Sequence, residues 1–429
     1  MFIKMFFVIF LASFLLLGWV RSEDCPYDRL STQHTFCRKP NLSCNIHHSG
    51  VKKNYIEEIL KVHNLYRSNI ALGKETRAIG GSLPKASNMM QMVWDDKLAA
   101  IAQKWADNCV YQHDCNDCRS VDDFSVGQNI AYQDWLCSEQ RCMDSITEAQ
   151  LEPEWNKIIE DFYMEVADFD KSVVQKFHQN PGQVIGHFTQ IIWAQSWRIG
   201  CGYTVFRTGM NYRRFYVCNY GPTGNIRDEP IYKAGNPCAD CPINSCCGKS
   251  CKLKMEYPGL CKMKNPNTAP IYPRDLTGLI FNCDGDRDTS DCEAKVSGVD
   301  RWKFKSNLNG NYASIVLNGG EWSTVTFKHR ISPSKDNFCV RIIFRKGPLK
   351  AGQPDQSHLK ADFSPTGYLP VYMDLSMTSP VYVPFNLDLK WKAETKFNLT
   401  FSVENNASPQ MLEIKEIIAY DGKCSSRTF

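Results

Sequence analysis

The sequence lacks a strong excess of charge of either sign. Its 429 residues contain 50 lysines and arginines against 46 aspartates and glutamates, which gives a net charge of +4. Proteins that bind nucleic acid or anionic membranes through electrostatics usually carry a concentrated basic surface. A composition this close to neutral does not call for such a partner, and we do not expect nucleic acid to be one.

Long apolar runs are missing after Val20. The stretch from Met5 to Val20 carries no charge, but it is shorter than the ~20 apolar residues that a membrane helix needs. Lys4 precedes this stretch, and Arg21, Ser22 and a polar sequence follow it, which is the pattern of a secretory signal peptide. We interpret residues 1–22 as a signal peptide, whose removal takes away Lys4 and Arg21 and lowers the net charge from +4 to +2. A membrane anchor is the alternative.

Two common hydrolase motifs are also missing from the sequence. It has no Gly-x-Ser-x-Gly nucleophile elbow and no His-Glu-x-x-His zinc-binding helix. The two best-known routes to an activated serine or a zinc-bound water are therefore excluded, and we do not expect an enzyme.

Cysteine, in contrast, is abundant. All 20 cysteines follow residue 22, and an even number at this density is typical of disulfides formed in an oxidising compartment. Three N-glycosylation acceptors agree with export: Asn41, Asn398 and Asn406. Asn398 falls in a strand-like run and Asn406 in the turn after it, so Asn406 should be modified more readily. The sequence predicts a secreted, extracellular protein.

Hydrophobic periodicity predicts an α+β domain over residues 23–229. Apolar residues at three- and four-residue steps predict helices over 54–70, 94–109 and 155–169, with Asp95 or Asp96 as the N-cap of the second. Strand-like runs over 202–206 and 213–220 predict a late hairpin, and Cys201 and Cys218, which bracket it, are expected to be bonded. Helices followed by a hairpin are typical of a layered α+β fold.

Residues 230–429 divide into a cysteine-rich segment and a segment of alternating apolar and polar residues. Residues 230–275 hold six cysteines and few apolar residues, so we expect a disulfide-rich hinge followed by a linker over 263–273. Zinc at Cys238 and Cys241 is the alternative that would suit a cytosolic protein. Residues 276–429 alternate between apolar and polar positions with turns between the runs, which predicts a mainly-β, sandwich-like domain.

Three polar side chains fall where the helical patterns place the core: His63, Glu165 and His187. A buried carboxylate is costly unless it is paired, and two imidazoles beside it would provide partners. The same ligands suit zinc. The alternative is that each inward histidine is a hydrogen-bonded structural residue, and spacing alone does not decide between the two.

Several segments resemble, in order, the signature segments of the CAP superfamily, which includes cysteine-rich secretory proteins, antigen-5 allergens and plant pathogenesis-related proteins. The segments are His63-Asn64-Leu65-Tyr66-Arg67, Gly127-Gln128-Asn129-Ile130, Gly186-His187-Phe188-Thr189-Gln190-Ile191-Ile192-Trp193, Gly200-Cys201-Gly202 and Tyr216-Val217-Cys218-Asn219-Tyr220. The resemblance covers about residues 50–225. Gln128 and the N-terminal cysteines are most similar to the arthropod antigen-5 branch. Residues 237–261 resemble a shortened hinge of cysteine-rich secretory proteins, and the β-rich tail has no counterpart in the minimal family.

The resemblance implies an α-β-α sandwich with a central cleft that is lined by two histidines and two acidic residues. His63 and His187 match the histidines and Glu165 matches one acid, whereas the second acid falls at the neutral Gln128. We therefore expect His63, Glu165 and His187 in one pocket with Gln128 at its edge. Zinc is the candidate metal, bound more weakly than by a cleft with two acids. No cofactor is required.

The resemblance also frames the functional hypotheses. The first is a secreted, non-enzymatic venom allergen-like or salivary effector that binds a lipid, a receptor or a channel. The second is a metal-dependent hydrolase or protease in which His63 and His187 hold zinc and Glu165 serves as base. The third is an ion-channel regulator that acts through the cysteine-rich hinge over 238–261 and its lysines; a solvated basic spacer is the simpler interpretation of that segment.

Overall fold

The computed structural model describes residues 25–424, with gaps at 137–145, 252–256, 275, 286–289, 308–309, 356, 366–368, 370, 376–378 and 406–407. The signal peptide over 1–22 and the acceptor Asn406 lie outside the described residues. Within the described part, no helix has the length and apolarity needed to cross a membrane.

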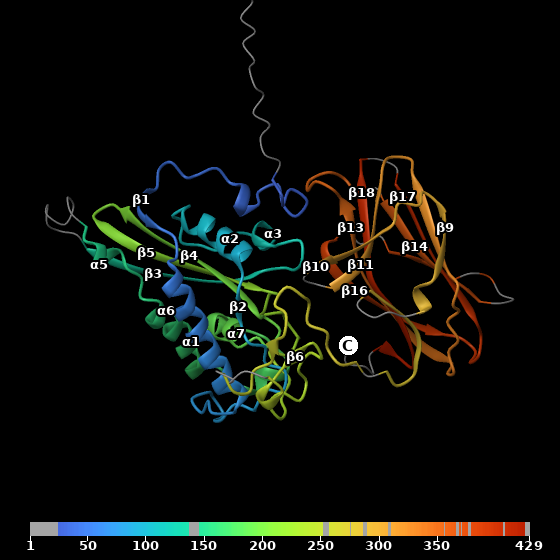
Figure 1. The fold of residues 1–429 in the computed structure, drawn as a ribbon, viewed down its shortest axis with the longest axis horizontal. Coiled ribbons are helices and arrows are strands. Elements are labelled where there is room, and N and C mark those ends of the chain that lie inside the picture. The colour runs from blue at the N-terminus through green and yellow to red at the C-terminus, as the bar shows by residue number, and fades with distance from the viewer. Residues whose placement is uncertain are drawn as a thin grey trace, which may run out of the picture.

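The first lobe is a three-layer α-β-α sandwich (Figure 1). Its antiparallel sheet has the order β1-β4-β5-β3, and the short β2 joins β4 in parallel. The strands are β1 (Asn45–Ser49), β2 (Val93–Trp94), β3 (Gly127–Leu136), β4 (Arg198–Thr208) and β5 (Asn211–Gly221). One face is covered by α2 (Asp96–Ala106) and α3 (Asn116–Arg119), the other by α1 (Lys53–Ala71), α6 (Trp155–Met164) and α7 (Gly186–Ile191). The short elements are η1 (Thr35–Cys37), α5 (Glu148–Leu151), η2 (Glu165–Asp168) and η3 (Lys171–Gln175).

Two glycines let α2 lie directly on the sheet. A Cβ at Gly200 would come within 2.1 Å of the backbone nitrogen of Ala99, and one at Gly202 within 2.4 Å of the backbone of Gln103. Asp95 is the N-cap of α2, since its carboxylate accepts hydrogen bonds from the backbone of Lys97 and Leu98. Only glycine allows a helix and a strand to approach this closely. Gly200 and Gly202 therefore set the spacing between α2 and the sheet.

The cysteine-rich segment packs against the first lobe. It contains the short strands β6 (Ser245–Cys246) and β7 (Lys262–Met263) and the turn η4 (Gly248–Ser250). Its disulfides are Cys238–Cys247, Cys241–Cys261 and Cys246–Cys251. The following linker is also anchored, because the Asn244 side chain donates to Ala269 O at 2.7 Å and accepts from the backbone of Ile271 at 2.9 Å. The linker composition predicted a spacer, and these contacts fix it to its surroundings.

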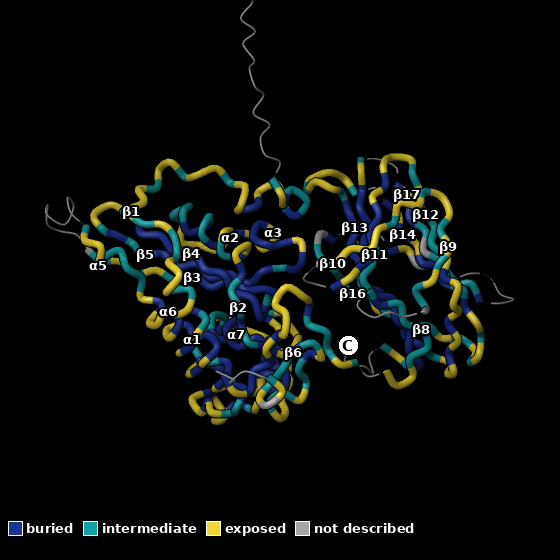
Figure 2. The backbone as a smooth tube through the Cα atoms, in the orientation of Figure 1, coloured by how far each residue is buried: buried dark blue, intermediate teal, exposed yellow. Residues whose placement is uncertain are grey.

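The second lobe is a β-sandwich. One sheet has the order β10-β11-β18-β13-β16 with β8 beside β18, and the other has the order β15-β14-β17-β12-β9. Apolar side chains from both sheets form its core, and buried residues run through the centre of each lobe (Figure 2). The disulfides Cys283–Cys292 and Cys339–Cys424 close it. The elements are β8 (Leu279–Asp284), η5 (Ser290–Cys292), β9 (Ala294–Gly298), β10 (Lys303–Asn307), β11 (Gly310–Leu317), β12 (Trp322–Phe327), β13 (Asn337–Pro348), β14 (Ser357–Pro365), β15 (Val371–Asp374), β16 (Ser379–Lys390), β17 (Phe397–Asn405) and β18 (Gln410–Asp421).

Polar contacts join the two lobes. Arg345 on β13 is buried and forms an ion pair with Glu413 at 2.5 Å, and its guanidinium also donates to the carbonyl of Asp122 in the first lobe. The backbone N–H of Ala351 donates to the carbonyl of Asp28 at 2.7 Å. The N-terminal loop therefore lies between the two lobes and contacts both.

Candidate functional site

Glu165 and His187 form a hydrogen-bonded pair in the helical layer that contains α1, α6 and α7. Glu165 begins η2, directly after α6, and His187 lies in the first turn of α7. The Nδ1–H of His187 donates to Oε1 of Glu165 at 2.5 Å. Oε2 accepts from the backbone N–H groups of His187 at 2.9 Å and Phe188 at 3.0 Å. Both carboxylate oxygens are therefore engaged, and they fix the orientation of the imidazole, which also stacks on Phe162.

Gln128 on β3 is paired with a histidine that the sequence patterns did not single out. The Nδ1–H of His113 donates to Oε1 of Gln128 at 2.8 Å, and the Gln128 amide donates to Asp114 at 3.2 Å and to Asn219 at 3.1 Å. His113 is exposed at the surface, but the protein packed around its ring lowers its pKa, and the charges of Arg119 and His187 act in the same direction. Gln128 is followed on β3 by Asn129, whose side chain donates to the carbonyl of His187 at 3.1 Å.

The identity of residue 128 has a structural reason. An amide can accept from His113 and donate to Asp114 at the same time, whereas a carboxylate can only accept. A glutamate at this position would place two carboxylates against each other, and one of them would have to keep a proton. Gln128 therefore links the His113 loop to β3 as a neutral group.

His63 occupies a different place from the one expected. It lies on the inward face of α1 and is 0 % exposed. Its Nδ1–H donates to Ile59 O at 2.8 Å, so its Nε2 accepts from the hydroxyl of Tyr220 at 2.9 Å. Burial lowers the pKa of His63 to about 4. Both ring nitrogens are committed to the protein, and the ring is held neutral.

The structure therefore brings together only part of the expected set. Glu165 and His187 are in direct contact, and Gln128 precedes Asn129 on β3, whose side chain donates to the carbonyl of His187. His63 reaches the pair indirectly, because Asn129 donates both to the hydroxyl of Tyr220 at 3.3 Å and to the carbonyl of His187 at 3.1 Å. Placing His63 among the metal ligands is thus corrected, for the physical reason that it has no free lone pair in this arrangement.

Two histidines of this region each keep one ring nitrogen that could bind a metal. Each of His113 and His187 has its Nδ1–H fixed by an oxygen acceptor, which turns Nε2 into the free lone pair. Such an oxygen acceptor behind a metal-binding imidazole is the usual arrangement at zinc sites. In the described chain, groups of at least three metal-binding side chains occur only around cysteines that are disulfide-bonded. His113 and His187 belong to no such group among the described residues, and each of them offers one ring nitrogen to a metal.

The sequence profile of the CAP family, the cysteine-rich secretory protein family, matches residues 60–220. "CRISP/Allergen/PR-1" of Trittame loki is 42% identical over 412 residues, which cover 95% of this chain and 97% of that protein. This chain belongs to the CAP family. "Venom allergen 5" of Tityus serrulatus is 38% identical and covers 94% of each chain. The crystal structure of Na-ASP-1 shares 28% identity over 52% of each chain with a TM-score of 0.40.

Two relatives from Tityus serrulatus that align over nearly the whole chain are named "Venom allergen 5" and "Cysteine-rich venom protein", so this is a venom-type CAP protein that carries a β-sandwich after the CAP domain. The predicted family and fold class are thereby confirmed. The disulfide expected across the hairpin is also present in the CAP domain: Cys201 and Cys218 face one another on β4 and β5, with Cα atoms 4.1 Å apart.

The described glycosylation acceptors lie in both lobes. Asn41, near the start of the CAP domain, is half-buried and donates to Asn108 O at 2.9 Å, while its carbonyl oxygen accepts from Ser43. Asn398 lies half-buried on β17, and its side-chain oxygen accepts from Arg330 at 3.1 Å. The expectation that Asn406 is modified more readily than Asn398 stays a prediction.

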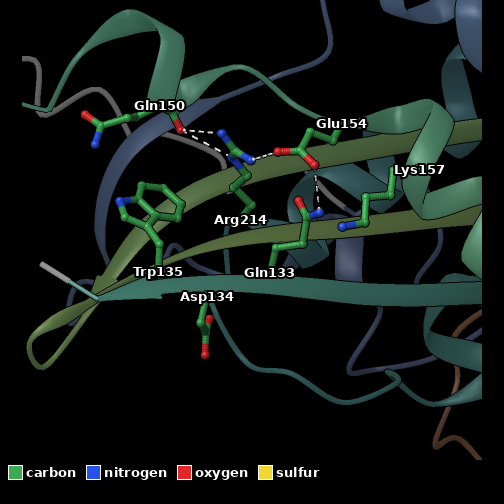
Figure 3. Close-up of a pocket in the computed structure, with 7 residues that line it drawn as sticks. All are labelled: Gln133, Asp134, Trp135, Gln150, Glu154, Lys157 and Arg214. Carbon is green, nitrogen blue, oxygen red and sulfur yellow. Dashed lines mark hydrogen bonds and ion pairs between the residues drawn. The ribbon is translucent and has the colours of Figure 1, made fainter.

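The CAP domain has a second recess, of about 480 Å³, at the far end of β3 (Figure 3). Arg214 crosses it, donating to Glu154 at 2.5 Å and to the carbonyl of Gln150, and its guanidinium lies 5.2 Å from the ring centre of Trp135. Gln133 donates to the same glutamate. Arg214 and Glu154 form an ion pair across the recess, and Lys157 also lines it.

Proposed function

We propose that this CAP protein is exported and acts by binding an extracellular target, without catalysis of its own. The observation that carries the proposal is the state of Glu165. Its two oxygens accept three hydrogen bonds, from the His187 ring and from the backbone of His187 and Phe188. A general base needs a lone pair directed at the proton that it removes. The hydrogen bonds that Glu165 accepts hold the imidazole of His187 in one orientation. Glu165 therefore acts as a positioning group.

The hydrolase hypothesis is weakened at two of its named parts, His63 and Glu165. It needs His63 as a zinc ligand, but the lone pair of His63 accepts from Tyr220. It needs Glu165 as base, but the oxygens of Glu165 accept three hydrogen bonds, and the position of the family's second acid holds the neutral Gln128. An active site requires a nucleophile, a base and an electrophilic group in mutual contact. The contacts found here are those of a fixed scaffold.

Export is supported by the cysteines. The 18 described cysteines form nine disulfides, and none of them is free. Such bonds persist in oxidising compartments and are reduced in the cytosol. The venom names of the relatives agree with this compartment. Of the binding partners considered, a lipid, a receptor and a channel stay open.

The absence of catalysis is tested by following hydrolysis of casein and of p-nitrophenyl acetate by the purified protein, with and without added ZnCl₂. We expect the same background rate for wild type, His187→Ala and Glu165→Gln, because the oxygens of Glu165 are engaged by His187 and Phe188 and cannot serve as the base. A rate that exceeds background in the wild type and is abolished by His187→Ala would assign catalysis to the cleft and reject the proposal.

A second candidate function is zinc binding at His113 and His187, which the two free Nε2 atoms favour. Calorimetric titration with ZnCl₂ should show one weak site in the wild type. His187→Ala and His113→Ala should each weaken binding by more than about tenfold, since each removes one of two protein ligands. His178→Ala, which changes an exposed histidine, is the matched control and should bind like the wild type. Equal affinity in all four proteins would exclude the cleft as the zinc site.

A further inference from the structure

The disulfide between Cys115 and Cys118 differs from the others that the structure describes. It joins cysteines three positions apart at the start of α3, whereas the other described disulfides span between five and 85 positions. A crosslink constrains the unfolded chain less as the loop that it closes becomes shorter. Its contribution to the stability of the fold should therefore be the smallest of the set.

The two sulfurs differ in access. Cys115 is exposed, while Cys118 is 0 % exposed. Among the described cysteines only Cys37 shares this exposure, and it belongs to a loop that closes over 12 positions. Thiol–disulfide exchange begins with the attack of a thiolate on one sulfur along an open line of approach. An incoming thiol can therefore reach Sγ of Cys115, and Cys118 is the leaving group.

Both sulfurs of the Cys115–Cys118 disulfide have polar contacts that would persist after the disulfide is reduced. The backbone N–H of Cys118 donates to Sγ of Cys115 at 3.1 Å, which favours negative charge on that sulfur when a second thiol releases it. On the buried side, Sγ of Cys118 lies 3.7 Å from the hydroxyl of Ser31, within reach of a sulfur hydrogen bond. Each sulfur thus has a polar contact in addition to the bond between the two sulfurs.

The surrounding backbone is held without the disulfide. Arg119 donates to the carbonyl and carboxylate of Asp114 at 2.8 and 2.9 Å and to Val126 O at 2.8 Å. The N-terminal segment, which lies beside α3 in Figure 1, adds a bond of 2.5 Å from Thr35 to the same aspartate. These bonds bracket the two cysteines on both sides. Opening the disulfide should leave the segment folded.

We propose that Cys115–Cys118 is a thiol–disulfide exchange site for external thiols, either small thiols or exposed protein thiols. A thiolate bonds to Sγ of Cys115 as the bond between the two cysteines breaks. The electron pair leaves on Sγ of Cys118, which takes up a proton. A second external thiolate then attacks the outer sulfur of this mixed disulfide and releases Cys115. Two external thiols are oxidised to one disulfide, and Cys115 and Cys118 are reduced to two thiols. The proposal does not depend on the cleft.

The first test uses reduced glutathione as the probe thiol. The full-length protein is incubated with a limiting amount at neutral pH, quenched in acid, alkylated and mapped by mass spectrometry. We expect glutathione on Cys115, and opening of Cys115–Cys118 at least roughly tenfold faster than that of Cys25–Cys37 or Cys246–Cys251, which serve as internal controls. Glutathione on Cys118, or earlier opening of either control disulfide, would overturn the proposal.

Two sets of variants separate exchange from a purely structural role. Cys118→Ser leaves Cys115 as an accessible thiol and should react rapidly with one equivalent of Ellman's reagent, whereas Cys115→Ser leaves the buried Cys118 and should react slowly. The double variant Cys115→Ser/Cys118→Ser should be secreted with an unchanged urea midpoint. Loss of secretion of the double variant, or equal reactivity of the two single variants, would show that the disulfide is a structural crosslink and contradict the proposal.

Discussion

Arg67→Ala should abolish or nearly abolish folding, the largest effect that we expect from any single substitution. Arg67 on α1 is 0 % exposed, and burial lowers its pKa to about 9. It has no carboxylate partner among the described residues. Instead it donates to four backbone carbonyls, those of Met90, Ile191, Trp193 and Ala194, at 2.7 to 2.9 Å. These bonds tie α1 to the loop before β2 and to the chain that leaves α7.

The size of the effect follows from what the substitution leaves behind. An unsatisfied buried carbonyl costs about 1–3 kcal/mol, and removing the long side chain adds a cavity. Relief from burying a cation offsets part of this, so we expect a loss of about 4 kcal/mol or more, close to the whole stability of an ordinary domain. Arg67→Lys, with fewer donors, should lose less. Secreted yield and urea unfolding measure both, with the exposed Arg227→Ala as control. An unchanged urea midpoint for Arg67→Ala would contradict this role.

Acidification should destabilise the protein in two successive steps, the first of which belongs to His63. The folded protein holds the pKa of His63 at about 4, against 6.5 for the unfolded chain. Below pH 6.5 the unfolded state binds a proton that the folded state does not, so stability falls as the pH drops from 6.5 to 4. The difference amounts to about 3 kcal/mol.

Glu75 supplies the second step. Burial alone would raise its pKa, but hydrogen bonds from Arg77 and Tyr163 outweigh that effect and lower the pKa to about 2. A depressed carboxyl pKa stabilises the folded state above pH 4.5, and this contribution is lost as the pH falls toward 2. The effect of His63 on stability therefore appears between pH 6.5 and 4, and the effect of Glu75 appears below pH 4.5.

Urea unfolding at pH 7 and pH 4.5 measures the first step. The wild type should lose stability between the two values, and His63→Gln should lose less, although its stability at pH 7 is lower because its contacts with Ile59 and Tyr220 are altered. His178→Gln, which changes an exposed histidine, should show the wild-type dependence. If His63→Gln and wild type had the same pH dependence, the neutral buried state of His63 would be wrong.

The parts of the fold governed by local periodicity could be predicted from the sequence. The helix predicted over 54–70 is α1 at Lys53–Ala71, and the hairpin predicted from alternation is β4 and β5. The helix predicted over 155–169 ends at Met164 and continues as the 3-10 turn η2, a change that places Glu165 where it can accept from the backbone of α7.

The strands β1 and β3 and the roles of His63 and His113 depend on contacts between segments that are distant in the sequence. β1 and β3 were not predicted, because each is defined by pairing with a strand far along the chain. His63 carries the periodicity of a core residue, and its role follows from a bond to Tyr220, 157 positions away. His113 follows α2 in an irregular loop without periodicity, so only its contact with Gln128 identifies it. The sequence spacing of apolar residues predicts which face of a helix a residue occupies. It does not predict which atoms the side chain contacts there.

The central claim is that His113 and His187 present their Nε2 atoms in the cleft, while His63 is a neutral core residue. Long-range ¹H–¹⁵N NMR of the ¹⁵N-labelled protein tests it most directly, because it reports the tautomer and protonation of each imidazole. We predict that His63 stays neutral with its proton on Nδ1 down to pH 5 and does not respond to ZnCl₂, while the Nε2 signals of His113 and His187 shift together as zinc is added. A His63 that protonates near pH 6.5, or whose Nε2 signal shifts with zinc, would contradict the account.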